Sequence, residues 1–349
     1  MSRLLPRTFL VSILALAACV AIAPARPARA SQPATPLVHL PADAASHNGA
    51  PIEWWYVVGH LRSAAHTFGY EVTIFKFNHV RPPGFSTPLS LYRTDVAITD
   101  LAGRRFHQRV TYYFPTSASL STSRLDERVG KARLSGSSPR TMSVAASLPG
   151  GAIQLSLDSL RPTMYVGGRG YLSFGTGYTY YYSLTDLRTT GSLTVGKKAY
   201  RVTGVSWLDH QWGNWSWTSV RGWTWMALQL SNGVQLSVFD VRAAGQRVRA
   251  ASILTPGGTT LTDRRMTIAA SGAWRSPHTR GVYPARWTVR IPTQRAVLNV
   301  TPALPDQELY VPNEPRGSYW EGTGTVSGTW QGRRVSGLSY TELTGFAPA

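Results

Sequence analysis

Two short stretches, WWYVVGHL at residues 54–61 and WTWMALQL at residues 223–230, decide the fold predicted for this chain. In each, aromatic residues begin a strand-like run and a turn follows. A second run then ends on Phe, VTIF in the first case and LSVF in the second. Each pair of runs is typical of an antiparallel hairpin, so the chain uses the same hairpin twice unless the similarity is chance. The repeat distance of about 165 residues is too long for a solenoid and predicts two sister domains.

The rest of the chain has the same strand-like character. Gly, Pro, Ser and Asn separate short segments, and helical periodicity is nearly absent. Many short strands predict a sandwich or a barrel, and with the repeated hairpin they predict an all-β protein of two barrel-like halves. Apolar residues alternate with polar or aromatic ones at period two in seven segments: 70–77, 94–99, 153–157, 178–184, 225–240, 287–291 and 296–300.

The N-terminus has the form of an export signal. Two arginines precede an apolar run, and residues 28–30 form the small-x-small motif that a signal peptidase cleaves. Cys19, the one cysteine of the chain, also completes a lipoprotein-type signal, and cleavage before it would leave a lipid-anchored protein. We therefore expect an exported protein, periplasmic or secreted, with a signal peptide at residues 1–30 or a lipoprotein signal at residues 1–18.

The chain is strongly basic, with a formal net charge of +19 at pH 7. Such a charge favours anionic surroundings. The basic residues are almost all Arg, and they are scattered along the chain without a basic block or a recognisable nucleic-acid module. This distribution indicates a solvated surface facing the anionic cell envelope, and we predict no nucleic-acid partner.

Four motifs carry a resemblance to a known family. The stretch GVSWLDHQWGNW at 204–215, with EWWY at 53–56 upstream, resembles the paired signature of the hydroxyneurosporene synthase (carotenoid 1,2-hydratase) and AttH-like family. Two further matches, YWEG at 319–322 and GLSYTELTG at 337–345, follow in the expected order. Together the four motifs span nearly the whole chain beyond the export signal.

This resemblance implies a fold and a range of activities. The fold is two lipocalin-like β-barrels in tandem, here at residues 36–216 and 217–349. Members of the family hydrate isolated carbon–carbon double bonds of carotenoids or other isoprenoids, and relatives cyclise polyenes. The family also includes many exported proteins of no known activity.

Hydration of an isolated alkene needs an acid, surroundings that tolerate a cation, and a positioned water. A carboxyl group in a dry aromatic pocket has a raised pKa and can be the acid, and Trp faces stabilise a cation. Asp209 and His210, among Trp207, Trp212 and Trp215, best supply these parts. We predict Asp209 as acid, His210 as its partner or as a water-positioning base, and Trp212 as a wall beside His210 on one strand face. The alternative is structural: Asp209 caps a turn, and His210 and the tryptophans lock the junction between the domains.

Glu53 is a second catalytic candidate, because a carboxylate among large aromatic residues must be paired or neutral. An Arg partner such as Arg93 would make it structural. Asp240 ends a strand and is expected to be solvated, and the tyrosines at residues 178–182 are expected on both strand faces. Core packing explains the aromatic positions as well as a ligand cavity does. The substrate-binding candidates are Trp55, Tyr56, Trp207, Trp212, Trp223 and Trp225.

Several catalytic motifs are absent from the sequence. It contains no Gly-x-Ser-x-Gly elbow, no His-Glu-x-x-His helix, no Walker loop and no dinucleotide-binding glycine pattern. The eight histidines show no metal-ligand spacing, so we expect neither a metal nor a cofactor. The predicted partner is an apolar, isoprenoid-like or lipid-like small molecule. The protein is then either a hydratase or related lyase, a non-catalytic carrier, or an AttH-like attachment or export accessory protein.

Overall fold

Segments in which apolar and polar residues alternate form β-strands in the described part of the chain. The computed structural model describes residues 35–348, except residues 65, 83, 85, 139, 175–176, 217, 244, 313 and 315–316. The predicted export signal, with Cys19 and the cleavage motif at 28–30, lies outside the described residues. Within the described ranges, no helix combines the length and the apolar character needed to cross a membrane.

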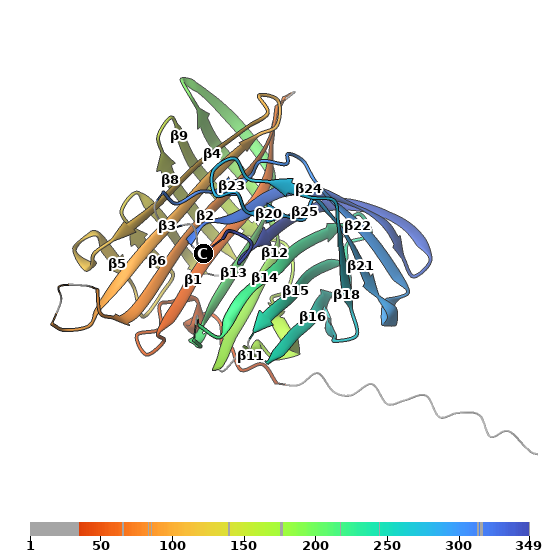
Figure 1. Cartoon of the computed structure of the whole chain (residues 1–349), viewed down its shortest axis with the longest axis horizontal. Coiled ribbons are helices and arrows are strands. Elements are labelled where there is room, and N and C mark those ends of the chain that lie inside the picture. Colours follow the sequence, from red (N-terminus) through yellow and green to blue (C-terminus); the bar gives the residue numbers. More distant parts are fainter. Residues whose placement is uncertain are drawn as a thin grey trace, which may run out of the picture. The chain divides into compact units, whose positions relative to one another are not determined.

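Thirteen strands between residues 52 and 214 form the first sheet, coloured red to green in Figure 1. They are β1 (Ile52–Ser63), β2 (His66–Val80), β3 (Leu89–Asp100), β4 (Arg105–Tyr113), β5 (Ala118–Leu120), β6 (Asp126–Val129), β7 (Ala132–Ser138), β8 (Thr141–Leu148), β9 (Gly151–Ser159), β10 (Met164–Tyr165), β11 (Tyr171–Phe174), β12 (Gly177–Val195) and β13 (Lys198–Asn214). Their order is β4-β3-β2-β1-β13-β12-β9-β8-β7-β6-β5, and β10 and β11 pair with β12.

Ten strands between residues 220 and 343 form the second sheet. They are β14 (Val220–Leu230), β15 (Gln235–Ala243), β16 (Gln246–Leu254), β17 (Thr260–Asp263), β18 (Thr267–Ser271), β21 (Arg286–Ile291), β22 (Ala296–Pro302), β23 (Glu308–Leu309), β24 (Tyr319–Trp330) and β25 (Arg333–Leu343). Their order is β17-β16-β15-β14-β25-β24-β22-β21-β18, and β23 pairs with β24. A separate pair consists of β19 (Trp274–Arg275) and β20 (Val282–Tyr283).

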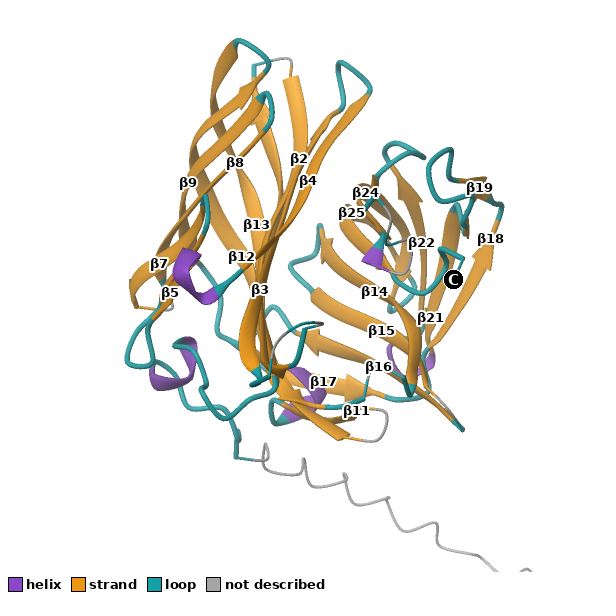
Figure 2. Ribbon diagram, turned by 60° about the vertical axis from the view of Figure 1, so that its left-hand side comes forward, coloured by secondary structure: helices purple, strands orange, loops and turns teal. Residues whose placement is uncertain are grey.

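Helical structure in the described residues is limited to short 3₁₀ turns, drawn in purple in Figure 2, and four of them lie wholly within the described ranges. The strands around them curl into two barrel-like sheets, which confirms the predicted all-β fold. The four turns are η1 (Ala42–Ala44), η2 (Pro115–Ser117), η3 (Val166–Gly168) and η4 (Pro292–Gln294).

The two predicted hairpins hold matching places in the two sheets. β1 lies between β2 and β13, and β14 lies between β15 and β25. The predicted segment at 225–240 spans two strands, because a turn at residues 231–234 separates β14 from β15. The chain passes from the first sheet to the second between Asn214 and Val220.

Three clusters of buried side chains form the core. One fills the first sheet and includes Trp55 and Trp212, and a second fills the second sheet. The third lies between the sheets and combines Tyr56 and Trp207 of the first with Trp225 of the second. Each fully buried large apolar side chain stabilises the fold by roughly 1.5–3 kcal/mol, so this third cluster holds the sheets together.

Candidate active site

β13 presents its side chains to two different environments. Because neighbours along a strand point to opposite faces, Trp207 and Asp209 face the cluster between the sheets, whereas His210 and Trp212 face the interior of the first sheet. The motif at residues 204–215 is therefore a strand and not a turn over most of its length. Its residues belong to two separate polar centres.

A pocket lies on the Asp209 side, between the two sheets. The pocket and its opening to solvent together have a volume of about 680 Å³. Most of its wall is aromatic, and strands of both sheets contribute to it. The lining residues are Trp54, Tyr56, Phe75, Leu172, Tyr181, Asp209, Gln211, Trp223, Trp225, Phe239, Val241, Tyr319 and Glu342.

Asp209 is the buried acid of this pocket, with 3% of its surface exposed. Its Oδ1 accepts hydrogen bonds from the Ser183 hydroxyl at 2.5 Å and from the Trp207 indole nitrogen at 2.6 Å, and its Oδ2 accepts one from the Tyr181 hydroxyl. Burial raises the pKa of Asp209 to about 7, although the three hydrogen bonds act to lower it. All three donors are uncharged, so the carboxyl group can exchange a proton near neutral pH.

Tyr181 connects Asp209 to the second sheet. Its hydroxyl oxygen accepts a hydrogen bond from the Trp225 indole nitrogen at 2.9 Å, and the Ser237 hydroxyl lies 3.4 Å away. Burial and the neighbouring Asp209 charge raise the pKa of Tyr181 well above the usual tyrosine value. Tyr181 therefore stays protonated, and its hydroxyl group donates a hydrogen bond to the Asp209 carboxylate.

Glu342 on β25 is a second carboxyl group in the wall of the pocket. Burial raises the pKa of Glu342 to about 8; a hydrogen bond from Trp223 opposes this rise, and the charge of Asp209 adds to it. At neutral pH the Glu342 side chain is therefore mainly protonated.

A network of acids and tyrosines borders the pocket and joins the sheets. The Tyr56 hydroxyl donates to Glu321 Oε1 at 2.5 Å. The Tyr319 hydroxyl contacts Glu71 Oε1 at 3.0 Å and Asp95 Oδ2 at 2.6 Å. Burial, then the charge of Asp95, raises the pKa of Glu71 to about 8. These bonds run between strands of different sheets, so they fix the position of one sheet against the other.

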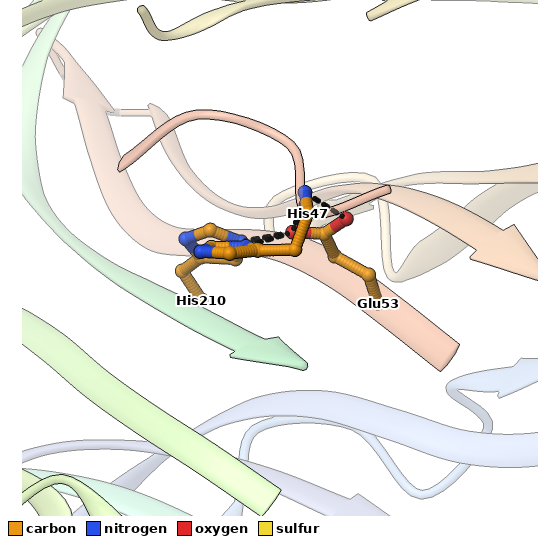
Figure 3. A group of neighbouring side chains, drawn as sticks. All are labelled: His47, Glu53 and His210. Carbon is orange, nitrogen blue, oxygen red and sulfur yellow. Dashed lines mark hydrogen bonds and ion pairs between the residues drawn. The ribbon is translucent and has the colours of Figure 1, made fainter. Parts of the chain in front are cut away.

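The opposite face of β13 belongs to a separate centre around Glu53, shown in Figure 3. Glu53 Oε1 contacts His47 Nδ1 at 2.7 Å and His210 Nε2 at 3.0 Å, and Lys76 Nζ donates to Oε2 at 2.8 Å. Trp55 stacks on the His210 ring. Burial alone would raise the pKa of Glu53, but the bonds to both histidines and the Lys76 charge lower it well below the usual range. Burial lowers the pKa of His210.

His47, Glu53 and His210 are also the described residues whose ligand atoms best suit a metal ion, since these atoms lie within 4.8 Å of one another. The Lys76 ammonium group already neutralises the Glu53 carboxylate. Ser46 and the backbone nitrogen of His47 also donate to that carboxylate. A bound cation would have to displace several of these donors, so the donor set fits a hydrogen-bonded anchor of the N-terminal segment better than it fits a metal centre.

The structure corrects three expectations about the polar residues. Asp209 and His210 do not form the predicted pair, because adjacent strand residues face opposite sides and His210 binds Glu53 instead. Arg93 is not the partner of Glu53; it forms an ion pair with Asp95 at 2.7 Å.

Asp240 is the third correction. It is 4% exposed and not solvated, because Arg247 binds both of its carboxylate oxygens at 2.6 Å.

The aromatic candidates divide between the two centres. Tyr56, Trp223 and Trp225 line the pocket, Trp207 binds Asp209 beside it, and Trp55 and Trp212 lie with His210 inside the first sheet.

Several residues with a place in these centres were not singled out from the sequence, among them His47, Lys76, Glu321 and Glu342. His47 and Lys76 carry no motif of their own, and strand register alone brings Lys76 opposite Glu53. Glu321 and Glu342 lie inside two of the family motifs, and the presence of an acid within such a motif was the signal that could have identified them. Tyr181 belongs to the tyrosine-rich strand whose hydroxyl groups were considered for orienting water.

Known proteins with related sequences include a dehydratase and a hydratase. The dehydratase asqC of Emericella nidulans is 26% identical over 272 residues, which cover 72% of this chain and 76% of that protein. Kievitone hydratase of Fusarium solani subsp. phaseoli is 27% identical over 204 residues, 54% of this chain and 55% of that protein.

Solved structures with the same fold confirm the lipocalin-like architecture. A protein described as an AttH from Nitrosomonas europaea superposes with a TM-score of 0.78 at 25% identity, covering 90% of this chain and 98% of that one. Kievitone hydratase from Nectria haematococca gives a TM-score of 0.74 at 20% identity, with coverages of 90% and 94%. A family model described as AttH-like matches residues 31–346. Because this match covers most of the chain, the protein belongs to the AttH-like family.

Proposed function

We propose that this protein is a hydratase or dehydratase that adds water to, or removes it from, an apolar and isoprenoid-like substrate in the pocket between the sheets. One observation carries the proposal. Asp209 is a buried carboxyl group in an aromatic pocket, its hydrogen-bond donors are uncharged, and its pKa is raised to about 7. Such a group can give or take a proton at neutral pH.

The pocket wall suits the chemistry of that reaction. Protonation of an isolated alkene leaves a positive charge on carbon, and the electron-rich faces of indole rings stabilise a cation. Trp54, Trp223 and Trp225 all line the pocket. Gln211 and Tyr56 in the same wall offer polar groups that can hold a water molecule. A carboxyl group, indole faces and a water site are the three requirements of the reaction.

The related proteins support the same class of reaction. One is a dehydratase and one is a hydratase, and these two names describe opposite directions of one chemical change. A carotenoid as substrate and export across the membrane belong to the proposal and rest on the sequence motifs. The N-terminus of the protein recovered from its host tests export: Ser31 as the first residue indicates a secreted form, and a lipid-modified Cys19 indicates an anchored one.

Hydration is tested by incubating the purified protein with acyclic isoprenoids in water enriched in heavy oxygen, followed by mass spectrometry. We expect products heavier by one labelled water for the wild type. Asp209→Asn should reduce their formation by about 10²–10⁴-fold, the usual contribution of a proton-transfer group. The matched control is Asp263→Asn, which changes a buried carboxylate outside the pocket and should leave product formation unchanged.

Two results would contradict the proposal. If the compounds co-purify with the protein but never gain water, the pocket belongs to a carrier. If Asp209→Asn is as active as the fully active control Asp263→Asn, another group transfers the proton and Asp209 is structural.

A further inference from the structure

Asp209 has a counterpart in the second half of the chain. The six residues GVSWLD at 204–209 match GLSYTE at 337–342: glycine, an aliphatic residue, serine, an aromatic residue, a variable residue and an acid. The first run lies on β13 and the second on β25. By this match Asp209 corresponds to Glu342.

The strand order supports the same correspondence. The two sheets have the same order of strands. The series β4-β3-β2-β1-β13-β12-β9-β8-β7 of the first sheet matches, position by position, the series β17-β16-β15-β14-β25-β24-β22-β21-β18 of the second. β13 and β25 are therefore equivalent strands, and so are β1 and β14. Across the equivalent pairs, Asp209 lies opposite Tyr56, and Glu342 lies opposite Trp225.

The two glycines that begin the runs confirm the register. A Cβ added to Gly204 would collide with the backbone oxygen of His60 on β1, and one added to Gly337 would collide with that of Gln229 on β14. His60 and Gln229 are themselves the seventh residues of the repeated stretches at 54–61 and 223–230. The same close backbone approach thus occurs in both sheets, five residues before the acid.

Both acids lie in the wall of one pocket, but their hydrogen bonds differ. Asp209 accepts bonds from Tyr181, Ser183 and Trp207, and three donors favour the ionised form of a carboxyl group. Glu342 has the Trp223 indole as its donor. The surroundings therefore hold Asp209 as a carboxylate more strongly than they hold Glu342.

From this geometry we propose that Glu342 is a second catalytic residue of the pocket, acting as the acid while Asp209 acts as the base. The proposal rests on the hydratase or dehydratase function proposed above. It reverses the acid role that the sequence predicted for Asp209, because three donors surround that carboxylate. Burial raises the pKa of both carboxyl groups, that of Glu342 to about 8 and that of Asp209 to about 7.

The reaction balances with these two groups. In hydration, the Glu342 carboxyl gives its proton to one alkene carbon, and the π electrons form the new C–H bond. Water attacks the resulting cation at the other carbon, and the Asp209 carboxylate takes the proton that this water releases. Transfer of that proton through solvent from Asp209 to Glu342 restores the starting state. Dehydration is the same sequence reversed, with Asp209 giving a proton to the leaving hydroxyl group and Glu342 taking one from carbon.

The first test is the pH dependence of product formation from about pH 5 to about pH 10. The wild type should give a bell-shaped profile whose rising limb reflects Asp209 and whose falling limb reflects Glu342. Glu342→Gln should lower the rate by about 10²–10⁴-fold and abolish the falling limb, and Glu342→Asp should restore part of the rate. The matched control is Glu127→Gln, a buried glutamate outside the pocket, which should preserve rate and profile.

A titration followed by NMR tests the pair without a substrate. In protein with ¹³C-labelled glutamate, the Glu342 carboxyl signal is identified by its loss in Glu342→Gln. Asp209→Asn should move the midpoint of this signal to lower pH, because a neighbouring negative charge has been removed. An unmoved midpoint would mean that the two groups do not interact, and the paired mechanism would be wrong.

The outcomes separate this inference from the proposed function. An active wild type with a fully active Glu342→Gln variant overturns the role of Glu342 and leaves the hydratase function standing. A wild type that transforms none of the isoprenoids, while these compounds remain bound, overturns both.

Discussion

Asp209 and His210 are consecutive residues that belong to different parts of the molecule. Asp209 binds Tyr181 on the side of β13 that faces the second sheet, and His210 binds Glu53 on the side that faces the interior of the first. Both side chains are buried. One strand therefore serves a pocket on one face and an internal ion-pair network on the other, so substitutions at these two positions should have different consequences.

Tyr181→Phe should alter the pH dependence of catalysis. The Tyr181 hydroxyl favours the Asp209 carboxylate, so its loss should raise the pKa of Asp209 above its present value of about 7. The rising limb of the pH–rate profile should then move to higher pH. The rate at neutral pH should fall by roughly tenfold for each pH unit through which that limb moves.

The control for Tyr181 is its neighbour Tyr182, whose ring packs against His210 on the opposite face. Tyr182→Phe should leave the profile in place. An equal displacement in both variants would mean that the change arises from general disturbance of β12 and not from the lost hydrogen bond.

Lys76→Met should destabilise the fold strongly. Glu53 is fully buried, and removal of the Lys76 ammonium group leaves a carboxylate with less compensating charge. Breaking such a pair costs roughly 3–5 kcal/mol of unfolding free energy, measurable by urea titration. Arg188→Met, which breaks the exposed ion pair with Asp158, should cost about 1 kcal/mol or less.

The loss caused by Lys76→Met also has a pH signature. The pKa of Glu53 is lowered in the folded protein, so its contribution to stability is present above the pKa of an unfolded glutamate and is lost as the pH falls. Without Lys76 the folded-state pKa rises, and acid unfolding should begin at higher pH than in the wild type. Unchanged acid unfolding would show that the two histidines alone maintain the low pKa.

Glu127→Gln should stabilise the protein in alkaline solution. Glu127 is fully buried, and burial, with the nearby charge of Glu53, raises its pKa to about 9. A raised pKa gives a contribution that is complete below the unfolded pKa and is lost as the pH rises toward the folded value. The gain over the wild type should thus grow from near zero at about pH 4 to on the order of 5 kcal/mol at about pH 9.

Glu314→Gln is the control for that gain, because Glu314 is an exposed glutamate of the same size. Its effect on the urea midpoint should be small at both pH values. A Glu127→Gln variant that is less stable than the wild type at about pH 9 would contradict the prediction. It would show that the folded protein stabilises the Glu127 carboxylate.

Gly204→Ala and Gly337→Ala should each destabilise the protein, by about 3 kcal/mol or more, because the new methyl group would overlap a backbone oxygen of the neighbouring strand. Thermal unfolding measures the loss. Gly49→Ala is the control, since no atom of any residue beyond its two chain neighbours lies within 4 Å of a Cβ placed there. If only one of the two strand glycines is sensitive, the close approach is not equally important in both sheets.

The sequence predicted much of the fold and part of the site. Period two in the strands led to the correct all-β class, and alternation placed His210 and Trp212 on one face, as the structure has them. In the structure Asp209, Tyr56, Trp223 and Trp225 line one pocket. Their catalytic and substrate-binding roles stay predictions.

Pairing between distant strands was beyond the reach of the sequence. His210 was matched with its neighbour Asp209, whereas its partner Glu53 lies 157 residues earlier in the chain. Register determines which side chains meet, and the buried cation opposite Glu53 is a lysine of β2 and not the arginine expected. Glu342 was visible only as one acid within a motif until the equivalence of β13 and β25 placed it in the pocket.

The matched strands that carry Asp209 and Glu342 indicate how such a pocket originates. A single-barrel ancestor that associated as a symmetric dimer would have placed two copies of one acid in a shared pocket, related by a two-fold axis. Fusion of the two copies into one chain frees each acid to change alone. One copy can then be an aspartate with three hydrogen-bond donors and the other a glutamate, so that two once-identical groups can divide the proposed roles of base and acid between them.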